Sequence, residues 1–387
     1  MKKVFKIILS YLLISFNIYV YSDENKSQNI LKIGVLAPLS GEFKSIGESV
    51  LYSINLATHD INDASIKIYP KDTGSSKKKL IEACKEFKNQ GIKIVIGPID
   101  SEFIDELKKF DDMVFLSLSN MDYNINKNVI MMGINLESQL LTIKNFIKKQ
   151  NKKRIVILYP DNKYANFVEK KIKLTNFKSP KLFKYSEDSE ILTGQIEKLT
   201  DYKKRKINLE ARVKKLEKSE NSKDIKELNK LKEKHTLGRI NFDSAIIIDF
   251  GNSLKSVLTS LAYTDVSEQN ILIIGANQWF DDSILEESSI KNFYFPSINL
   301  DNFNNFNKKF FKHYNYKPNE ISILAYDSLG LVYYYWKNNI KINSANNLNM
   351  KSDIKGKIGN FKIFDNKIIQ KLQIYKLEDN KFVKNNL

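Results

Sequence analysis

Along most of this chain, short runs of apolar residues alternate with segments whose apolar residues recur at helical spacing. The run LKIGVLAPL at residues 31–39 has the nearly continuous apolar character of a strand that is buried on both faces. The segment after it is typical of an amphipathic helix, with apolar positions at Val50, Ile54 and Ala57. Such strand and helix patterns alternate four times within about ninety residues, which predicts a parallel sheet with helices on both faces.

The alternation restarts at residue 136 and continues to residue 299. Its strand candidates are KRIVILYP, FDSAIIIDF and NILIIGAN, which alternate with helical patterns. The chain then ends with two helical segments, FNKKFFKHYNY and ISILAYDSLGLVYYYWKNN, and with a hairpin-like pair of strands around Asp365 and Asn366. We therefore predict an α/β fold of two lobes, each a parallel sheet flanked by helices, with a ligand cleft at the carboxyl ends of the strands.

The segment at residues 201–234 departs from this pattern because it is highly charged. It contains 13 lysines and arginines against 7 aspartates and glutamates, and it is rich in helix-forming residues. Two narrow apolar stripes, separated at Ser219–Ser222, predict two helices, with Ser222 capping the second. We predict a charged helical hairpin at residues 194–237, inserted in the second lobe, whose helices lean on each other or on a partner. It is either an inert, solvated hairpin or a docking surface.

The charge of the whole chain is strongly basic, with a formal net charge of +17. Such a charge often indicates a nucleic acid or an anionic membrane as partner. Here the lysines are dispersed, and lysine, asparagine and isoleucine are enriched throughout the sequence. The sequence contains neither an aromatic platform with arginines nor the ligand spacing of a zinc finger, so we predict no nucleic-acid partner.

The first residues have the pattern of an export signal. Lys2, Lys3 and Lys6 precede a short apolar stretch, and Val20-Tyr21-Ser22 resembles a cleavage site. We predict that residues 1–22 are a cleaved signal peptide, the alternative being an uncleaved membrane anchor. The only cysteine, Cys84, is too far along the chain for a lipobox, so we expect a protein that is soluble beyond the inner membrane.

Motifs for catalysis, nucleotides or metals are absent from the sequence. It has no glycine-rich dinucleotide or phosphate loop and no nucleophile elbow. Its three histidines, His59, His235 and His313, lack the spacing of metal ligands. Cys84 shares a helical face with apolar neighbours and is interpreted as a core residue. We therefore predict no catalytic residue, no metal and no cofactor, and a protein that binds rather than catalyses.

Five segments in order give the chain a family resemblance. They are IGVLAPLSGEFKSIGES, KDTGSSKKKLIEACKEFKNQGIKIVIGPIDS, VFLSLSN, RIVILYPDNKYA and YKPNEISILAYDSLGLV. Together they resemble type I periplasmic binding proteins of the leucine/isoleucine/valine-receptor kind. The resemblance implies a periplasmic protein whose two lobes close over a ligand by a hinge motion. It also implies that residues 31–135 and 300–345 form lobe one, and residues 136–299 and 346–387 form lobe two.

The resemblance implies ligand-binding positions in the cleft. Ser101, after GPID, and Ser119, in LSLSN, match positions that hold the α-carboxylate of an amino acid, and Tyr164, in DNKYA, matches an aromatic residue that closes from lobe two. The alternatives are that the serines cap helices or turns and that Tyr164 packs on its own lobe.

Two positions depart from the amino-acid receptors. Met121 stands where the family has a hydroxyl residue, and the uncharged Asn277 stands where an acid pairs with the ligand ammonium. A buried zwitterion needs both of its charges satisfied, so these departures weaken ordinary amino-acid recognition. Asp249 or Asp327 is the alternative source of the carboxylate.

Further segments, DTGSS, GANQWFDDSILEE and NFYFPS, with a charged helical segment before LGRINFDSAIII, resemble the penicillin-binding-protein activator branch of this superfamily. This resemblance implies a membrane-proximal protein that contacts a cell-wall synthase and regulates peptidoglycan synthesis. The chain departs from better-known members, which are lipoproteins with an additional N-terminal helical-repeat domain. The alternative is a receptor that delivers an amino acid or a similar small polar solute to an ABC permease.

Overall fold

The computed structural model describes residues 30–122, 125–266, 271–276, 279–280, 282–285, 293–350 and 352–385. The predicted signal peptide, residues 1–22, and the candidate site residue Asn277 lie outside the described residues. Within the described part, no helix is both long enough and apolar enough to cross a membrane.

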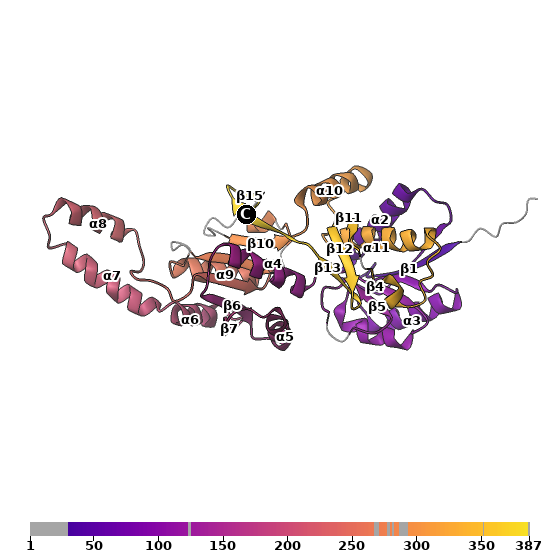
Figure 1. Ribbon diagram of the computed structural model, residues 1–387, viewed down its shortest axis with the longest axis horizontal. Helices are drawn as coiled ribbons and strands as arrows, with labels where there is room; N and C mark the ends of the chain where they lie inside the picture. The colour runs from indigo at the N-terminus through magenta and orange to yellow at the C-terminus, as the bar shows by residue number, and fades with distance from the viewer. Residues whose placement is uncertain are drawn as a thin grey trace, which may run out of the picture.

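The chain forms two separate sheets, each at the centre of one lobe (Figure 1). The sheet of lobe one has the strand order β11-β12-β13-β5-β4-β3-β1-β2. Its strands β1 to β5 run parallel, β13 pairs with β5 in parallel, and β12 is antiparallel to both β13 and β11. The strands are β1 (Leu31–Ala37), β2 (Ile66–Asp72), β3 (Ile94–Ile96), β4 (Val114–Ser117), β5 (Val129–Met131), β11 (Ile354–Gly356), β12 (Gly359–Phe364) and β13 (Lys367–Gln370).

The sheet of lobe two has the strand order β15-β14-β10-β9-β8-β6-β7. Strands β6 to β10 are parallel, whereas β14 and β15 are antiparallel to their neighbours. The central strands are buried along their whole length, as the apolar runs predicted. The strands are β6 (Ile155–Pro160), β7 (Lys181–Tyr185), β8 (Ser244–Ile248), β9 (Leu272–Ala276), β10 (Phe293–Ser297), β14 (Gln373–Glu378) and β15 (Lys381–Lys384).

Helices cover both sheets and also link the lobes. In lobe one, α11 packs along α2, and the hydroxyl of Ser53 donates to the carbonyl of Ser322 over 2.6 Å. Helix α10 begins beside the second sheet, where the amide of Leu300 donates to Tyr375, and it ends on α2. The helices are α2 (Lys44–Ile61), α3 (Lys77–Asn89), α4 (Leu136–Lys149), α5 (Ala165–Thr175), α6 (Ser189–Leu199), α9 (Gly251–Tyr263), α10 (Leu300–Tyr314) and α11 (Ser322–Lys337), with the 3-10 helices η1 (Ser101–Lys109), η2 (Asp282–Ile284) and η3 (Ala345–Leu348).

The C-terminal strands divide between the lobes, which corrects one expectation from the sequence. Residues 346–387 were expected in lobe two, but β11, β12 and β13 belong to the sheet of lobe one, and only β14 and β15 join lobe two. The physical reason is the burial of Phe361, Ile363 and Ile368, each at most 1% exposed, in the core of lobe one. The last crossing between the lobes therefore follows β13.

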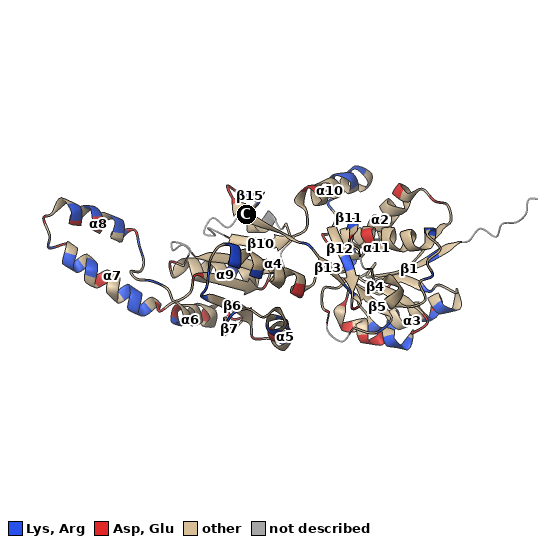
Figure 2. Cartoon of the chain, viewed as in Figure 1, with Lys and Arg blue, Asp and Glu red and all other residues tan. Residues whose placement is uncertain are grey.

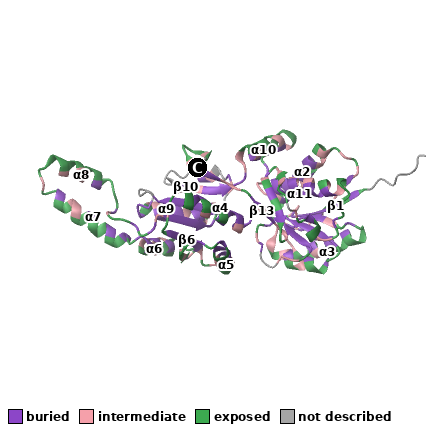
Figure 3. Ribbon diagram, viewed as in Figure 1, coloured by how far each residue is buried: buried purple, intermediate pink, exposed green. Residues whose placement is uncertain are grey.

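A helical hairpin projects from lobe two, between α6 and β8 (Figure 1). It consists of α7 (Tyr202–Leu216) and α8 (Ser222–Lys232), so the predicted fold class, including a charged hairpin in lobe two, is confirmed. The predicted cap is wrong by one residue. Asn221 caps α8, because its side chain accepts the amide of Lys223 over 2.9 Å, and Ser222 begins the helix. Most of the hairpin surface is exposed, in contrast to the buried sheets (Figure 3).

Candidate functional site

Two adjoining cavities lie in the cleft between the lobes, at the carboxyl ends of the parallel strands. The larger has a volume of about 580 Å³ and the smaller about 310 Å³. They share the side chains of Asn120, Met121 and Trp279, so both lobes contribute to their walls. A third cavity, of about 660 Å³, lies in lobe one between α11 and the β11–β12 hairpin, away from the cleft. The position at the strand ends is the usual place of a ligand in open parallel sheets, which makes the cleft the candidate site.

On the lobe-one side, the smaller cavity is lined by both serines named from the sequence. Ser101 begins η1 and is half-buried. Ser119 follows β4 and is 6% exposed, and its hydroxyl oxygen accepts the amide of Met121 over 3.1 Å. The hydroxyl of Ser119 therefore stabilises a turn, and its own proton remains to be donated.

On the lobe-two side, Tyr164 stands immediately before α5 and lines the larger cavity. The ammonium of Lys163 lies 5.1 Å from the centre of the Tyr164 ring. The same ammonium forms an ion pair of 2.8 Å with Glu102 in lobe one, and this hydrogen bond lowers the pKa of Glu102. The loop that carries Tyr164 is thus held against the opposite lobe.

Asp249 follows β8 and also lines the larger cavity. Its side chain is held by three donors: the hydroxyls of Tyr185 and Ser253, each at 2.5 Å, and the amide of Phe250 at 2.8 Å. Burial, followed by the charge of Asp249, raises the pKa of the Tyr185 phenol, which therefore stays a donor. These bonds fix the orientation of the carboxylate in the cavity wall.

The other carboxylate considered from the sequence, Asp327, lies outside the two cleft cavities. It is buried in lobe one, where it accepts the amides of Lys357 at 2.8 Å and Ile358 at 2.9 Å. Burial raises the pKa of Asp327 to about 6. Its role is to hold the turn between β11 and β12 against α11.

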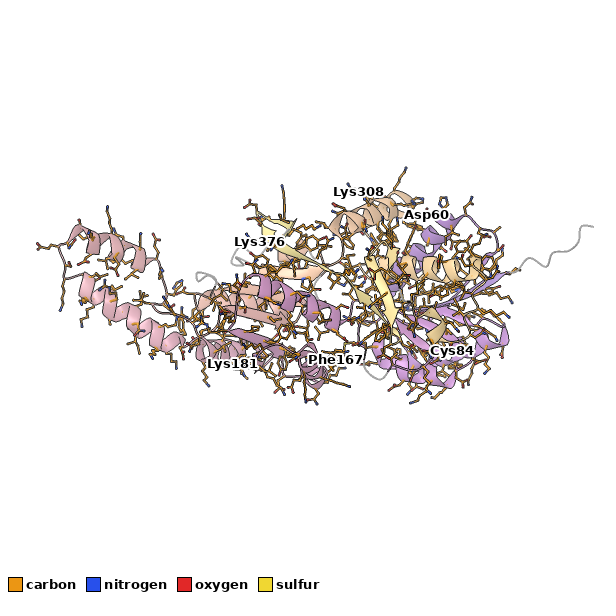
Figure 4. The ribbon with its side chains drawn as sticks, viewed as in Figure 1. Asp60, Cys84, Phe167, Lys181, Lys308 and Lys376 are labelled. Carbon is orange, nitrogen blue, oxygen red and sulfur yellow. The ribbon has the colours of Figure 1, made fainter. Side chains whose placement is uncertain are left out.

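Several residues of the cleft were not identified from the sequence, among them Asp100, Phe167, Glu187, Phe250 and Trp279. Phe250 is the second residue after β8. Asp100 comes shortly after β3, and Trp279 comes shortly after β9. Their position after buried strands was the available signal, because such residues meet at one edge of the sheet. Phe167, on α5, lies on the side of lobe two that faces lobe one (Figure 4), and only the helix packing places it there.

A buried ionic cluster joins the lobes beside the cleft. Asp122, in the loop after β4, lies 2.5 Å from the ammonium of Lys171 on α5 and 3.3 Å from that of Lys367 on β13. Glu137, on α4, lies 2.6 Å from Lys367 and 3.7 Å from Lys171. Burial alone would lower the pKa of Lys367, but the hydrogen bond to Glu137 and the two negative charges outweigh it and raise the pKa. We call these four residues the boundary cluster.

Other chemistry is limited in the part of the chain that the structure describes. No three His, Cys, Asp or Glu side chains gather there in an arrangement that could hold a metal ion. Cys84 is buried in the core of lobe one, and burial raises the pKa of its thiol to about 12. A thiol with so high a pKa is protonated at neutral pH and is not a nucleophile.

Comparisons with known proteins agree with this architecture. Residues 30–175 match the family described as periplasmic binding protein. No curated protein matches the chain. The branched-chain amino acid binding protein LivJ from Streptococcus pneumoniae, solved with isoleucine, is 19% identical, with 92% of this chain and 100% of LivJ covered and a TM-score of 0.55.

Two further solved structures are similar over nearly the whole chain. The C-domain of LpoA from Haemophilus influenzae, a regulator of PBP1A, is 14% identical, with coverages of 92% and 99% and a TM-score of 0.60. A solute binding protein of an ABC transporter from R. palustris, in complex with benzoate, is 14% identical, with coverages of 92% and 95% and a TM-score of 0.56. The chain thus has the two-lobed fold of type I periplasmic binding proteins, and the resemblance seen in its sequence is confirmed. These similar proteins are binding proteins and a regulator.

Proposed function

We propose that this chain is a non-enzymatic periplasmic protein that docks onto a peptidoglycan synthase and regulates it. The observation that carries the proposal is the α7–α8 hairpin, a projection that stands away from the cleft and that ligand binding does not require. The similarity to the LpoA C-domain, a regulator of PBP1A, supports the choice of partner. The pattern of residues 1–22 supports the location.

The hairpin has a small core and a firm cross-link of its own. Leu209 and Leu216 on α7 pack against Leu231 on α8. Arg212 donates two hydrogen bonds to the carboxylate of Glu227, of 2.9 and 2.7 Å, so the two helices are joined by a bidentate ion pair. These contacts place the two helices side by side.

The base of the hairpin is anchored to lobe two by Arg205, which is 3% exposed. Its guanidinium donates to the carbonyls of Thr264 at 2.9 Å and Thr200 at 3.3 Å, and to the hydroxyl of Thr236 at 2.5 Å. Thr236 in turn donates to Asp265 over 2.6 Å. A projection that is fixed in this way is preorganised, and a preorganised surface loses less entropy when it binds a partner.

The charge of the hairpin indicates the character of the partner surface. Residues 201–234 carry six more positive than negative charges, 13 against 7, and lysines and arginines are spread along both helices (Figure 2). Such a surface favours an acidic face on the partner and gives an association rate that falls as salt rises.

The test is the binding of the full chain to purified peptidoglycan synthases of the same organism. The triple variant K206E, K214E and K226E reverses three exposed hairpin charges and should weaken binding by about tenfold or more at low salt. The matched control, K85E, K93E and K312E, reverses three exposed lysines of lobe one and α10 and should bind like the unchanged protein. Equal binding by both variants would show that the hairpin is not the docking surface. No binding of any synthase by the unchanged protein would overturn the docking function itself.

A second candidate function is that of a solute receptor for an ABC transporter. The observation that favours it is the pair of cavities in the cleft, which both lobes line. LivJ, solved with isoleucine, and the benzoate complex show that the fold can hold such ligands. Binding of a solute by the unchanged protein, together with no synthase binding, would favour this second function.

A further inference from the structure

We infer that the cleft takes a small organic ammonium cation rather than a solute held by its carboxylate. The inference rests on the second candidate function in one respect, namely that the cleft binds a small molecule. It is independent of synthase docking, since the hairpin lies outside the cleft.

The charges on the cleft walls carry the first part of the argument. The charged side chains among the described residues that line the two cavities are Asp100, Glu187 and Asp249, and neither lysine nor arginine lines them there. Two lysines beside lining residues of the larger cavity have anionic partners: Lys163 is paired with Glu102, and Lys171 with Asp122. A carboxylate ligand would meet negative walls in a partly desolvated site, whereas a cation would be attracted.

Aromatic side chains carry the second part. Phe250, next to Asp249, is 67% exposed, although it lies in the wall of the larger cavity. Trp279 lines the same cavity, as do Tyr164 and Phe167, whose ring centres lie 5.1 and 5.5 Å from the ammonium groups of Lys163 and Lys171. Aromatic faces beside carboxylates attract ammonium groups, because the negative face of each ring stabilises the positive charge. A bound ammonium compound would cover the exposed ring of Phe250 with its alkyl groups and place its charge near Asp249.

The smaller cavity offers a further acceptor. Asp100 lines this cavity, and among the described residues no donor has full hydrogen-bond geometry to its buried Oδ2, although the Ser75 hydroxyl interacts with the carboxylate. Buried acceptors are almost always satisfied in native proteins, so this oxygen is suited to accept an N–H or O–H of a ligand. Met121, which lines both cavities, cannot donate a hydrogen bond to a carboxylate from its side chain.

Isothermal titration calorimetry on the purified protein tests the inference. The ammonium probes are choline, ethanolamine and spermidine. The comparison ligands are the neutral carbon isostere of choline, leucine as a zwitterion and benzoate as an anion. We expect an ammonium probe to bind about tenfold or more tightly than every comparison ligand. Phe250→Ala and Asp100→Asn should each weaken that binding by about tenfold. The matched control Phe311→Ala removes a ring that is 53% exposed on α10, outside the cleft, and should leave the binding unchanged.

Each other outcome overturns the inference in a recognisable way. Tighter binding of leucine or benzoate would overturn the choice of a cation while leaving the cleft as a ligand site. Equal binding of choline and its neutral isostere would show that charge does not select the ligand. No binding of any compound in the panel would overturn the cation inference, while the solute-receptor function would stand or fall on other solutes and synthase docking on its own assay.

Discussion

Both the boundary cluster and the hairpin contain ion pairs between a carboxylate and a basic side chain. These side chains are exposed to water to very different extents in the two regions. In the boundary cluster the side chain of Asp122 is 0% exposed and that of Lys171 is 6% exposed. In the hairpin, the corresponding exposures of Arg212 and Glu227 are 35% and 43%. Exposed pairs contribute little to stability because water and salt screen them. A buried pair is different, since the loss of one partner leaves an uncompensated charge in the interior.

This difference suits the two regions to different tasks. The boundary cluster connects the loop after β4 with α4, α5 and β13, so it fixes how the lobes meet beside the cleft. Most charged side chains of the hairpin are exposed to water, so they are available to form ion pairs with charged side chains of a partner.

The largest effect is expected for Asp122→Asn. This change leaves two buried ammonium groups, those of Lys171 and Lys367, to share the single carboxylate of Glu137. The free energy of unfolding should fall by about 3–5 kcal/mol, as for other broken buried pairs. Urea unfolding followed by tryptophan fluorescence measures it.

The matched control for this change is Asp112→Asn. Asp112 is 44% exposed and pairs with Lys88 over 3.2 Å, so its removal should cost less than about 1 kcal/mol. If the two variants lost the same stability, burial would not be what separates the two kinds of ion pair.

The next largest effect is expected for Arg205→Met. The change removes the guanidinium and leaves three buried acceptors, on Thr200, Thr236 and Thr264, without their donor. The local stability of the hairpin should fall by roughly 3–4 kcal/mol, because hydrogen bonds from a charged group are lost and buried acceptors are left unsatisfied. Hydrogen exchange of the amides of α7 and α8 measures this stability.

Arg212→Met is the control on the same helix. It removes an exposed ion pair. The local stability of the hairpin, measured by the same hydrogen exchange, should fall by about 0.5 kcal/mol or less. An equal effect of both variants would mean that the anchor at the base holds the hairpin no better than the pair on its surface.

The buried carboxylate of Asp327 gives the third effect. The pKa of Asp327 is raised to about 6 from an ordinary value of 3.8, so between these values the folded state holds a proton that the unfolded chain has lost. The contribution of Asp327 to the free energy of unfolding is therefore greatest below about pH 4 and decreases as the pH rises to about 6. Above about pH 6 it stays lower by roughly 2–3 kcal/mol. The difference in unfolding free energy between the unchanged protein and Asp327→Asn, measured from pH 4 to 7, should follow this curve.

Asp72→Asn tests the sign of this dependence. Burial alone would raise the pKa of Asp72, but hydrogen bonds from Ser40, Gly74 and Leu39 lower it to about 2. The contribution of Asp72 is therefore present above about pH 4 and is lost as the pH falls towards 2. Changes of the same sign for both variants would contradict the environments described for the two carboxylates.

Much of the fold could be predicted because its elements carry local signals. The apolar pattern of the sequence predicts the buried strands β1, β6 and β8. It also predicts the amphipathic helices between them. The strand β13 could not be assigned to its lobe in this way. Its alternating residues, with Ile368 buried, suit the edge of either sheet, and the pairing of Lys367 with Met131 depends on a residue far away in the chain.

The candidate site was predictable to the same degree. Tyr164 lies in the short loop between β6 and α5, Asp249 directly follows β8, and both line one cavity. The pairing of Asp122 with Lys171 had no sequence signal, because the first lies in a loop and the second on the buried face of α5. Even the cap of α8 shows the limit: Asn221 and Ser222 are both good capping residues, and only the backbone decides between them.

The path of the C-terminal strands has a consequence for how the protein can be divided. Lobe one needs β11 to β13 for the edge of its sheet, and lobe two needs β14 and β15, which follow after only Lys371 and Leu372. Neither lobe is therefore a continuous piece of the sequence, and no single cut of the chain releases a complete one. A fragment that ended before β14 would leave the β10 edge of lobe two open, with its backbone groups ready to pair with another chain. The two lobes must consequently be inherited, expressed and engineered together.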